Sequence, residues 1–367
     1  MSSLRPVTGG PAEVLAMLRE WNSLPEEPEP LVIETSGSTG RPKRVVLSRT
    51  ALRASASATL ERIGGPGQWL LNLPATYVAG VQVLFRSVLA GSEPVLLDEH
   101  PDFSTAAAAM SGSRRYVSLV PTQVHRMLRT PVDLQALRAF DVVLVGGAAV
   151  GEELRAAAGR AGIRIVATYG MSETCGGCVY DGVPLDGVAL AVGTDGQIRI
   201  GGPTLFSGYE DDLALTDQVM DGGWFLTSDF GRLDEDGRLQ VLGRMDDVVV
   251  SGGVNVPAQA VAERLRTHPS IETAEVVGVF DAEWGQRVVA VVVSPAGLET
   301  RRMPGLEDVR NWVSQVHPRI WAPRQLVRLD EIPLLPNGKV DRRELERLAR
   351  RDPADRKQPR PRRQADG

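Results

Sequence analysis

Residues 35–43 read Thr-Ser-Gly-Ser-Thr-Gly-Arg-Pro-Lys and follow the apolar run Leu31-Val32-Ile33. Glycines allow backbone N–H groups to turn inward, and serine and threonine hydroxyls add further donors. Such a loop can surround phosphate oxygens. The P-loop of nucleoside triphosphatases does not fit, because it requires glycine where Pro42 stands and serine or threonine where Arg44 stands. The stretch indicates a nucleotide site of another kind, although a flexible turn would look the same in isolation.

The composition is that of a globular protein. The chain has 367 residues, 43% of them apolar and 24% charged, and its formal net charge is -5. A nucleic-acid-binding protein usually carries a basic face, so this charge argues against that class. No apolar stretch is long enough for a membrane span or for the core of an N-terminal signal peptide. We expect a cytoplasmic protein of one large domain or two, and the sequence does not decide between a monomer and a homo-oligomer.

Short apolar runs alternate with helix-like segments in the first part of the chain. The predicted strands are 31–33, 69–73, 94–97, 116–120, 141–145 and 163–167, with helices over 11–22 and 79–90. Continuous apolar strands separated by helices are typical of a mostly parallel sheet that is covered on both faces. From about residue 196, short strands with Gly/Asp turns predict a small antiparallel region, at 197–200, 224–226 and 239–242.

A second change of pattern follows residue 245. The region after it predicts strands near 249–250, 274–280, 287–293 and 325–329, and helices near 257–266, 306–316 and 341–350. We therefore predict an α/β and α+β fold, with a large N-terminal domain over 1–245 and a small α+β domain over 246–350. Residues 351–367 are rich in Pro, Arg and Gln and poor in apolar side chains, which predicts a disordered tail.

The segment after strand 163–167 has residues that suit a nucleotide. In parallel α/β sheets, ligands bind at the carboxyl ends of the strands. Tyr169 offers an aromatic face, Glu173 a hard oxygen ligand for Mg²⁺, and Thr174 a hydroxyl for phosphate. A turn with a solvated carboxylate would contain the same residues, and this segment alone does not decide between the two.

Weaker signals lie elsewhere. Strand 141–145 ends in Gly-Gly-Ala-Ala at 146–149, which would let a flat ring approach the backbone. Asp229 could accept hydrogen bonds from two ribose hydroxyls, or it could belong to an ordinary turn. Lys339 ends a Pro-Asn-Gly-Lys turn, which is a common sequence and means little by itself.

Five segments, taken in order, resemble the acyl-adenylating superfamily of acyl-CoA synthetases, peptide-synthetase adenylation domains and luciferases. They are residues 35–43, 169–174, 228–231, 243–247 and 336–339, and the resemblance covers about residues 31–350. Each motif alone is weak, but five in the family order are specific. Segments 73–80, 120–123 and 172–182 resemble, less specifically, the o-succinylbenzoate–CoA ligases of menaquinone biosynthesis within it.

The resemblance implies an ATP-dependent ligase that joins a carboxylic acid to CoA through an acyl-AMP. It implies that Lys339 contacts both the substrate carboxylate and the α-phosphate, that Glu173 holds Mg²⁺ and that Thr174 contacts the α-phosphate. The residues implied to bind the nucleotide are Thr35, Ser36, Gly37, Ser38, Thr39, Gly40, Lys43, Gly147, Ala148, Tyr169, Gly170, Asp229 and Arg244.

The second half-reaction implies a mobile C-terminal domain that rotates about a hinge at Asp246. The resemblance then implies a CoA channel lined by Ser251, Gly252 and Gly253. The candidates for binding the acid are Tyr77, Arg86 and Thr122. The chain departs from the family pattern at Tyr77, Ser172, Gln259 and Val261, which leaves the shape of the acid pocket and some domain contacts open.

Cys175 and Cys178 have Cys-x-x-Cys spacing. Redox motifs with this spacing open a helix in a thioredoxin-like unit, and zinc needs further ligands, which the four scattered histidines do not offer. We therefore predict that both cysteines pack in the core or line a pocket.

Three alternatives remain from the sequence. The chemistry could serve another aryl or fatty acid. The chain could be a non-catalytic nucleotide- or CoA-binding homologue, although Lys339, Glu173 and Asp229 are all present. It could also be an adenylation module for a carrier protein.

Overall fold

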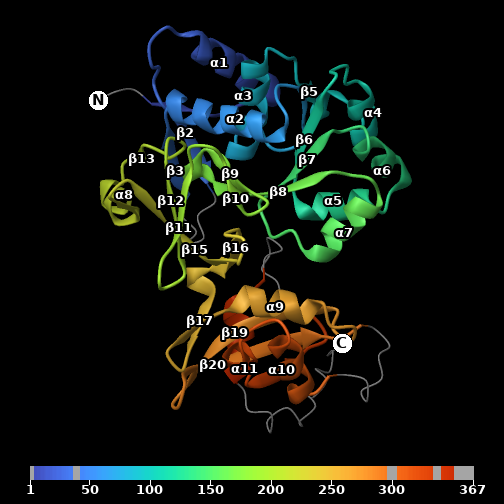
Figure 1. The fold of residues 1–367 in the computed structure, drawn as a ribbon, viewed down its shortest axis with the longest axis vertical. Helices are drawn as coiled ribbons and strands as arrows, with labels where there is room; N and C mark the ends of the chain where they lie inside the picture. Colours follow the sequence, from blue (N-terminus) through green and yellow to red (C-terminus); the bar gives the residue numbers. More distant parts are fainter. Residues whose placement is uncertain (1–3, 36–41, 296–303, 334–339, 351–367) are drawn as a thin grey trace, which may run out of the picture. The chain divides into compact units, whose positions relative to one another are not determined.

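The computed structural model describes residues 4–35, 42–295, 304–333 and 340–350, apart from the side chain of Asp246. The chain forms two compact units (Figure 1). Unit 1 comprises Met1–Gly193, Ile198–Thr227 and Arg232–Gln240; unit 2 comprises Thr194–Gln197, Ser228–Gly231 and Val241–Gly367. The predicted tail lies outside the described residues, and the predicted boundary after residue 245 stays a prediction.

A seven-stranded sheet forms the centre of unit 1, in the order β10-β9-β8-β7-β6-β4-β5. Its strands are β4 (Gln68–Leu71), β5 (Val95–Leu96), β6 (Arg115–Leu119), β7 (Val142–Val145), β8 (Ile165–Met171), β9 (Gly176–Tyr180) and β10 (Val183–Pro184). Pairing is parallel from β8 to β5, and antiparallel between β8, β9 and β10. The predicted parallel sheet is therefore confirmed for five strands.

Helices cover both faces of this sheet. Successive side chains of a strand point to opposite sides, and in these strands both sides are apolar. Trp69, Tyr116 and Leu144 pack with the helices of one face, whereas Leu70 and Val117 pack with those of the other. The first set of helices is α1 (Pro11–Ser23), α2 (Arg49–Ile63) and α3 (Val78–Ala90); the second is α4 (Phe103–Ala108), α5 (Pro121–Met127), α6 (Pro131–Leu137) and α7 (Glu152–Arg160) (Figure 1).

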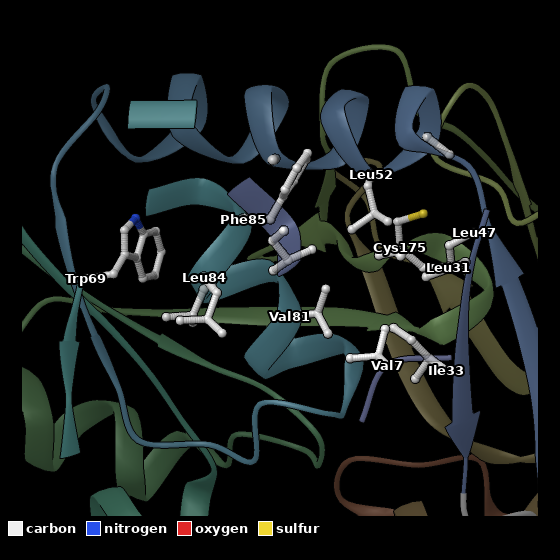
Figure 2. Close-up of a cluster of buried hydrophobic side chains, with 14 of the residues drawn as sticks. Val7, Leu31, Ile33, Leu47, Leu52, Trp69, Val81, Leu84, Phe85 and Cys175 are labelled. Atoms are coloured by element: carbon white, nitrogen blue, oxygen red, sulfur yellow. The ribbon is translucent and has the colours of Figure 1, made fainter. Parts of the chain in front are cut away.

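A second sheet carries the two ends of the serine- and glycine-rich stretch. It has the order β1-β2-β3-β13, with β1 (Arg5–Pro6), β2 (Leu31–Thr35), β3 (Lys43–Leu47) and β13 (Gly208–Tyr209). Pairing is antiparallel except between β1 and β2, so the mostly parallel arrangement does not extend to this sheet. Figure 2 shows Leu31, Ile33 and Leu47 of this sheet in one core with side chains of α2 and α3.

The predicted antiparallel region is also present. Its sheet has the order β11-β12-β15-β14, and β16 pairs with β15. The strands are β11 (Ala189–Val192), β12 (Gln197–Gly201), β14 (Met220–Asp221), β15 (Trp224–Leu233) and β16 (Leu239–Arg244), with helix α8 (Leu213–Val219) before β14.

Unit 2 is the predicted α+β unit. Its sheet has the order β18-β17-β20-β19, with β21 paired to β20. The strands are β17 (Val248–Ser251), β18 (Val254–Pro257), β19 (Thr273–Asp281), β20 (Gly285–Val293) and β21 (Gln325–Arg328). Two helices, α9 (Ala258–Arg266) and α10 (Leu306–Ser314), pack on one face, and α11 (Arg342–Arg350) packs on the other. None of the helices in the described parts of the chain is long and apolar enough to cross a membrane.

Helix α3 approaches the preceding loop so closely that Gly80 is required. A Cβ at this position would lie 2.1 Å from the carbonyl oxygen of Pro74. Gly→Ala inside a helix normally stabilises it by about 1 kcal/mol, but overpacking costs about 1–3 kcal/mol. We predict that Gly80→Ala lowers the thermal unfolding midpoint. The control is Gly159→Ala in α7, where a Cβ would meet nothing within 4 Å, so an unchanged or raised midpoint is expected. A raised midpoint for both variants would contradict this account.

Candidate active site

The carboxyl end of β8 continues into a tight turn that presents Glu173. The turn is the 3₁₀ helix η2 (Ser172–Thr174), followed by Cys175 in the left-handed conformation with φ 52°. The hydroxyl of Thr174 accepts a hydrogen bond from the Met171 N–H at 2.9 Å and donates to the Gly176 carbonyl at 2.7 Å. Thr174 is fully buried and its hydroxyl holds the turn in this structure; its contact with the α-phosphate stays a prediction.

Glu173 is a buried carboxylate, only 9% exposed. Its Oε1 accepts a hydrogen bond from the Tyr209 hydroxyl at 2.7 Å. Burial, and then the neighbouring Glu173 charge, raise the pKa of Tyr209 well above its usual range, so this phenol is the donor. Within the described parts of the chain, Glu173 Oε2 has neither a hydrogen bond nor an ion pair.

The contact of Tyr209 with Glu173 was not predicted from the sequence. Tyr209 stands on β13, a strand of two residues, and lies 36 positions from Glu173 in the sequence. No local pattern marks such a contact, because it depends on how β13 pairs with β3.

The two ends of the predicted phosphate loop are cross-strand partners. Thr35 pairs with Lys43 in the β2–β3 register, and the Thr35 hydroxyl donates to the Lys43 carbonyl at 3.4 Å. The ammonium of Lys43 lies 5.1 Å from the centre of the Tyr209 ring. The structure thus brings Lys43, Tyr209 and Glu173 together. The loop residues Ser36, Gly37, Ser38, Thr39 and Gly40 lie outside the described residues.

The neighbouring parallel strands end beside η2 with the predicted adenine residues. Strand β7 pairs with β8 and leads into Gly147, which has φ 81°, and Ala148; both are exposed. Tyr169 and Gly170 are partly buried at the end of β8, where the pairing with β9 shifts its register. Thr122 is exposed in the first turn of α5, directly after β6.

Of the other acid-binding candidates, Tyr77 is 51% exposed and lines a pocket of about 460 Å³ together with Thr35 and Arg44. Arg86 lies in the core, 3% exposed and outside the lining of that pocket, and its role in binding the acid stays a prediction. Its guanidinium donates to the Thr59 hydroxyl at 3.2 Å and lies 5.2 Å from the Trp69 ring centre. Burial lowers the pKa of Arg86.

Unit 2 holds the predicted ribose residues. Arg244 Nε lies 3.8 Å from Asp229 Oδ1, and Asp229 is 9% exposed. The predicted hinge, Asp246, lies in the 3₁₀ helix η3 (Met245–Asp247) between β16 and β17. Lys339 lies outside the described residues.

The predicted CoA channel residues form the β17–β18 hairpin. Ser251 pairs with Val254, so Gly252 and Gly253 make a two-residue turn, with φ 59° and 75°. Turns of this kind need positive φ at both positions, which glycine adopts without strain. The glycines are exposed, but the Ser251 side chain is fully buried, so it does not line an open channel in this structure.

A sequence model described as AMP-binding enzyme matches residues 22–210, and a second, described as AMP-binding enzyme C-terminal domain, matches residues 260–339. The chain belongs to the AMP-binding enzyme family. It is 45% identical to a probable 2-succinylbenzoate–CoA ligase of Mycobacterium tuberculosis, over 86% of this chain and 84% of that one. It is 31% identical to an indoleacetate–CoA ligase of Aromatoleum aromaticum, over 91% and 71%.

Solved structures agree with this family. The o-succinylbenzoate CoA synthetase (MenE) of Bacillus subtilis, in complex with the acyl-adenylate intermediate OSB-AMP, superposes with a TM-score of 0.71 at 25% identity, covering 86% of this chain and 68% of that one. The amide bond synthetase McbA of Marinactinospora thermotolerans gives 0.72 at 28% identity, covering 86% and 68%. The mixed α/β fold with a large first domain and a smaller second one is therefore confirmed.

The surroundings of Glu173 fit a magnesium ion bound with a nucleotide. Mg²⁺ prefers oxygen ligands and is usually held by one or two carboxylates together with substrate phosphates. Glu173 supplies such a carboxylate. Among the residues that the structure describes, the partner of this carboxylate is a neutral phenol, not a cation that would compete with a metal. No group of three metal-binding side chains occurs among the residues that the structure describes.

Both cysteines are buried free thiols. Figure 2 shows Cys175 pointing into the core, and Cys178 is 0% exposed. Both cysteines therefore pack in the core, which is one of the two predicted placements. Burial raises the pKa of Cys175 well above its usual range and that of Cys178 to about 12.

We predict that neither cysteine reacts in the native protein. A thiol with a pKa of about 12 is only about 0.01% thiolate at pH 8, and the thiolate is the reactive form. Titration with a chromogenic disulfide reagent at pH 8 should report no thiol before unfolding and both after addition of guanidinium. Rapid release of one equivalent from the native protein would contradict the buried placement.

Proposed function

We propose that this chain is a cytoplasmic, ATP-dependent acid–thiol ligase that converts o-succinylbenzoate to o-succinylbenzoyl-CoA through an acyl-adenylate, a reaction of menaquinone biosynthesis. The observation that carries the choice of acid is the 45% identity to a relative named for that substrate, over 86% of the chain. The geometry supports the chemistry, because the buried carboxylate of Glu173 and the ammonium of Lys43 both contact Tyr209.

The first half-reaction joins two anions. A carboxylate oxygen of the acid attacks the α-phosphorus of ATP, and the bond from that phosphorus to the bridging oxygen breaks to release pyrophosphate. We propose that Lys339 offsets the repulsion by contacting both groups, and that Thr35 and Lys43 hold the pyrophosphate end with the loop between them. Magnesium bound through Glu173 would neutralise charge on the phosphates.

We propose that adenine lies against Tyr169 and the exposed Gly147–Ala148 backbone, where no bulky side chain obstructs a flat ring. Asp229 would accept hydrogen bonds from the ribose hydroxyls beside the Arg244 guanidinium, whose Nε lies 3.8 Å from Asp229 Oδ1.

In the second half-reaction, the CoA sulfur attacks the acyl carbon and AMP leaves with the shared oxygen. The thiol proton is lost to solvent. The Gly252–Gly253 turn is exposed and has no side chains, which suits the passage of a pantetheine chain. Asp246 would serve as the hinge for the domain rotation.

The test is product detection by mass spectrometry with ATP, Mg²⁺ and CoA. The acids are o-succinylbenzoate, benzoate, indoleacetate and a medium-chain fatty acid. A CoA thioester from o-succinylbenzoate alone is the expected result. Thioester from another acid only would retain the chemistry and overturn the substrate. The absence of AMP and thioester with all four would favour a non-catalytic nucleotide-binding protein.

Lys339 is one of only three lysines in the chain, with Lys43 and Lys357. We predict that Lys339→Ala lowers pyrophosphate release by about 100-fold or more, because the charge that offsets two anions is lost. Thioester formation from supplied o-succinylbenzoyl-AMP and CoA should change little. Lys357→Ala is the matched control and should leave both half-reactions unchanged. Equal loss of the two half-reactions in Lys339→Ala would contradict the proposed role.

A further inference from the structure

A short segment, Phe206–Glu210, ties the Glu173 turn to the strand that begins with Lys43. On the turn side, the Phe206 N–H donates to the Glu173 carbonyl at 2.9 Å, and the Tyr209 hydroxyl donates to the Glu173 carboxylate at 2.7 Å. Main chain and side chain of Glu173 are therefore both fixed by residues 206–210, which we call the bridging segment.

On the other side, the bridging segment is held by β3. The Ser207 N–H donates to the Val46 carbonyl and the Glu210 N–H to the Arg44 carbonyl, each at 2.8 Å. Arg44 Nη1 also forms an ion pair with Glu210 Oε2 at 2.8 Å. The Glu210 side chain is 15% exposed and that of Arg44 is 39% exposed, so solvent reaches this pair from one side and the main-chain hydrogen bonds carry most of the connection. The segment is thus a short, firmly bonded connection between β3 and η2.

Tyr209 contacts both predicted phosphate-binding elements with one side chain. Its hydroxyl holds Glu173, and its ring lies 5.1 Å from the Lys43 ammonium. The ring also packs edge-on against Phe206, with 5.0 Å between centres, and is 5% exposed. Contacts with Glu173, Lys43 and Phe206 together hold the Tyr209 hydroxyl in one place.

We propose that Tyr209 is the positioning residue of the metal site: its hydroxyl occupies Glu173 Oε1 and so orients Oε2 toward the metal–nucleotide complex. The inference rests on the proposed function in that it needs ATP to bind with a divalent cation. Carboxylates that bind metals are commonly held by such a hydrogen bond, and its removal typically weakens metal binding by about 10–100-fold. Replacement by phenylalanine keeps the ring packing and removes only the hydroxyl.

The experiment measures ATP binding by titration calorimetry without acid or CoA, so that no reaction occurs. The quantity of interest is the ratio of the ATP Kd without Mg²⁺ to the ATP Kd with Mg²⁺. In wild type this ratio should be well above one. In Tyr209→Phe it should fall by about 10-fold or more, while the metal-free Kd changes little. The matched control is Tyr116→Phe, which removes a hydroxyl that donates to the Gly65 carbonyl at 3.1 Å, and its ratio should equal that of wild type.

A double-mutant cycle separates positioning from a general loss of structure. Glu173→Gln should lower the same ratio, and adding Tyr209→Phe to it should lower it no further, because the hydroxyl acts through the carboxylate. Additive losses, or a wild-type ratio in folded Tyr209→Phe, would overturn the inference and leave the proposed function intact. Absence of ATP binding by wild type would overturn both.

Discussion

The hydrogen bond from Tyr209 to Glu173 is the interaction on which the arrangement of the site depends. Removing a carboxylate from water is costly unless a donor replaces part of its hydration. A lysine or arginine partner would do so, but it would also neutralise the charge that a metal needs. A neutral phenol at 2.7 Å supplies the hydrogen bond and leaves the negative charge in place. Because the phenol lies on β13, this one contact also connects the sheet of β2 and β3 with the turn after β8.

The central sheet supplies the second constraint. Strands β6, β7 and β8 are parallel neighbours, so their carboxyl ends meet at one edge. Thr122, Gly147 and Glu173 follow these three strands and are brought together by pairing alone. Arg86 lies well inside α3, where it contacts Thr59 and Trp69. A charged residue on a mostly apolar helix can therefore be a core residue with hydroxyl and aromatic partners.

These two constraints explain what the sequence could and could not predict. Strands of the central sheet were recognisable because both of their faces are apolar, and the motifs after β7 and β8 followed from chain order. Helix α2 was not predicted, since its Arg/Ser/Ala-rich sequence has no clear apolar stripe. The Tyr209–Glu173 contact and the burial of Ser251 could not be predicted, because a contact over 36 positions and the direction of one side chain depend on sheet pairing. The phosphate loop and Lys339 remain predictions from sequence.

Arginine and lysine occur at different kinds of position in this chain. The chain has 41 basic residues, of which three are lysines. Arginine forms the ion pairs that fasten segments together, as in Arg44–Glu210, Arg155–Asp181 and Arg342–Asp247, because its planar fork suits carboxylates. Two of the three lysines fall in the segments proposed to meet phosphate, at Lys43 and Lys339. A compact ammonium on a flexible stem can follow charge as it moves between oxygens, which a rigid guanidinium fork does less well. Lysine at these two positions, in a chain whose other basic residues are arginines apart from Lys357, is therefore what a chemical role for them would require.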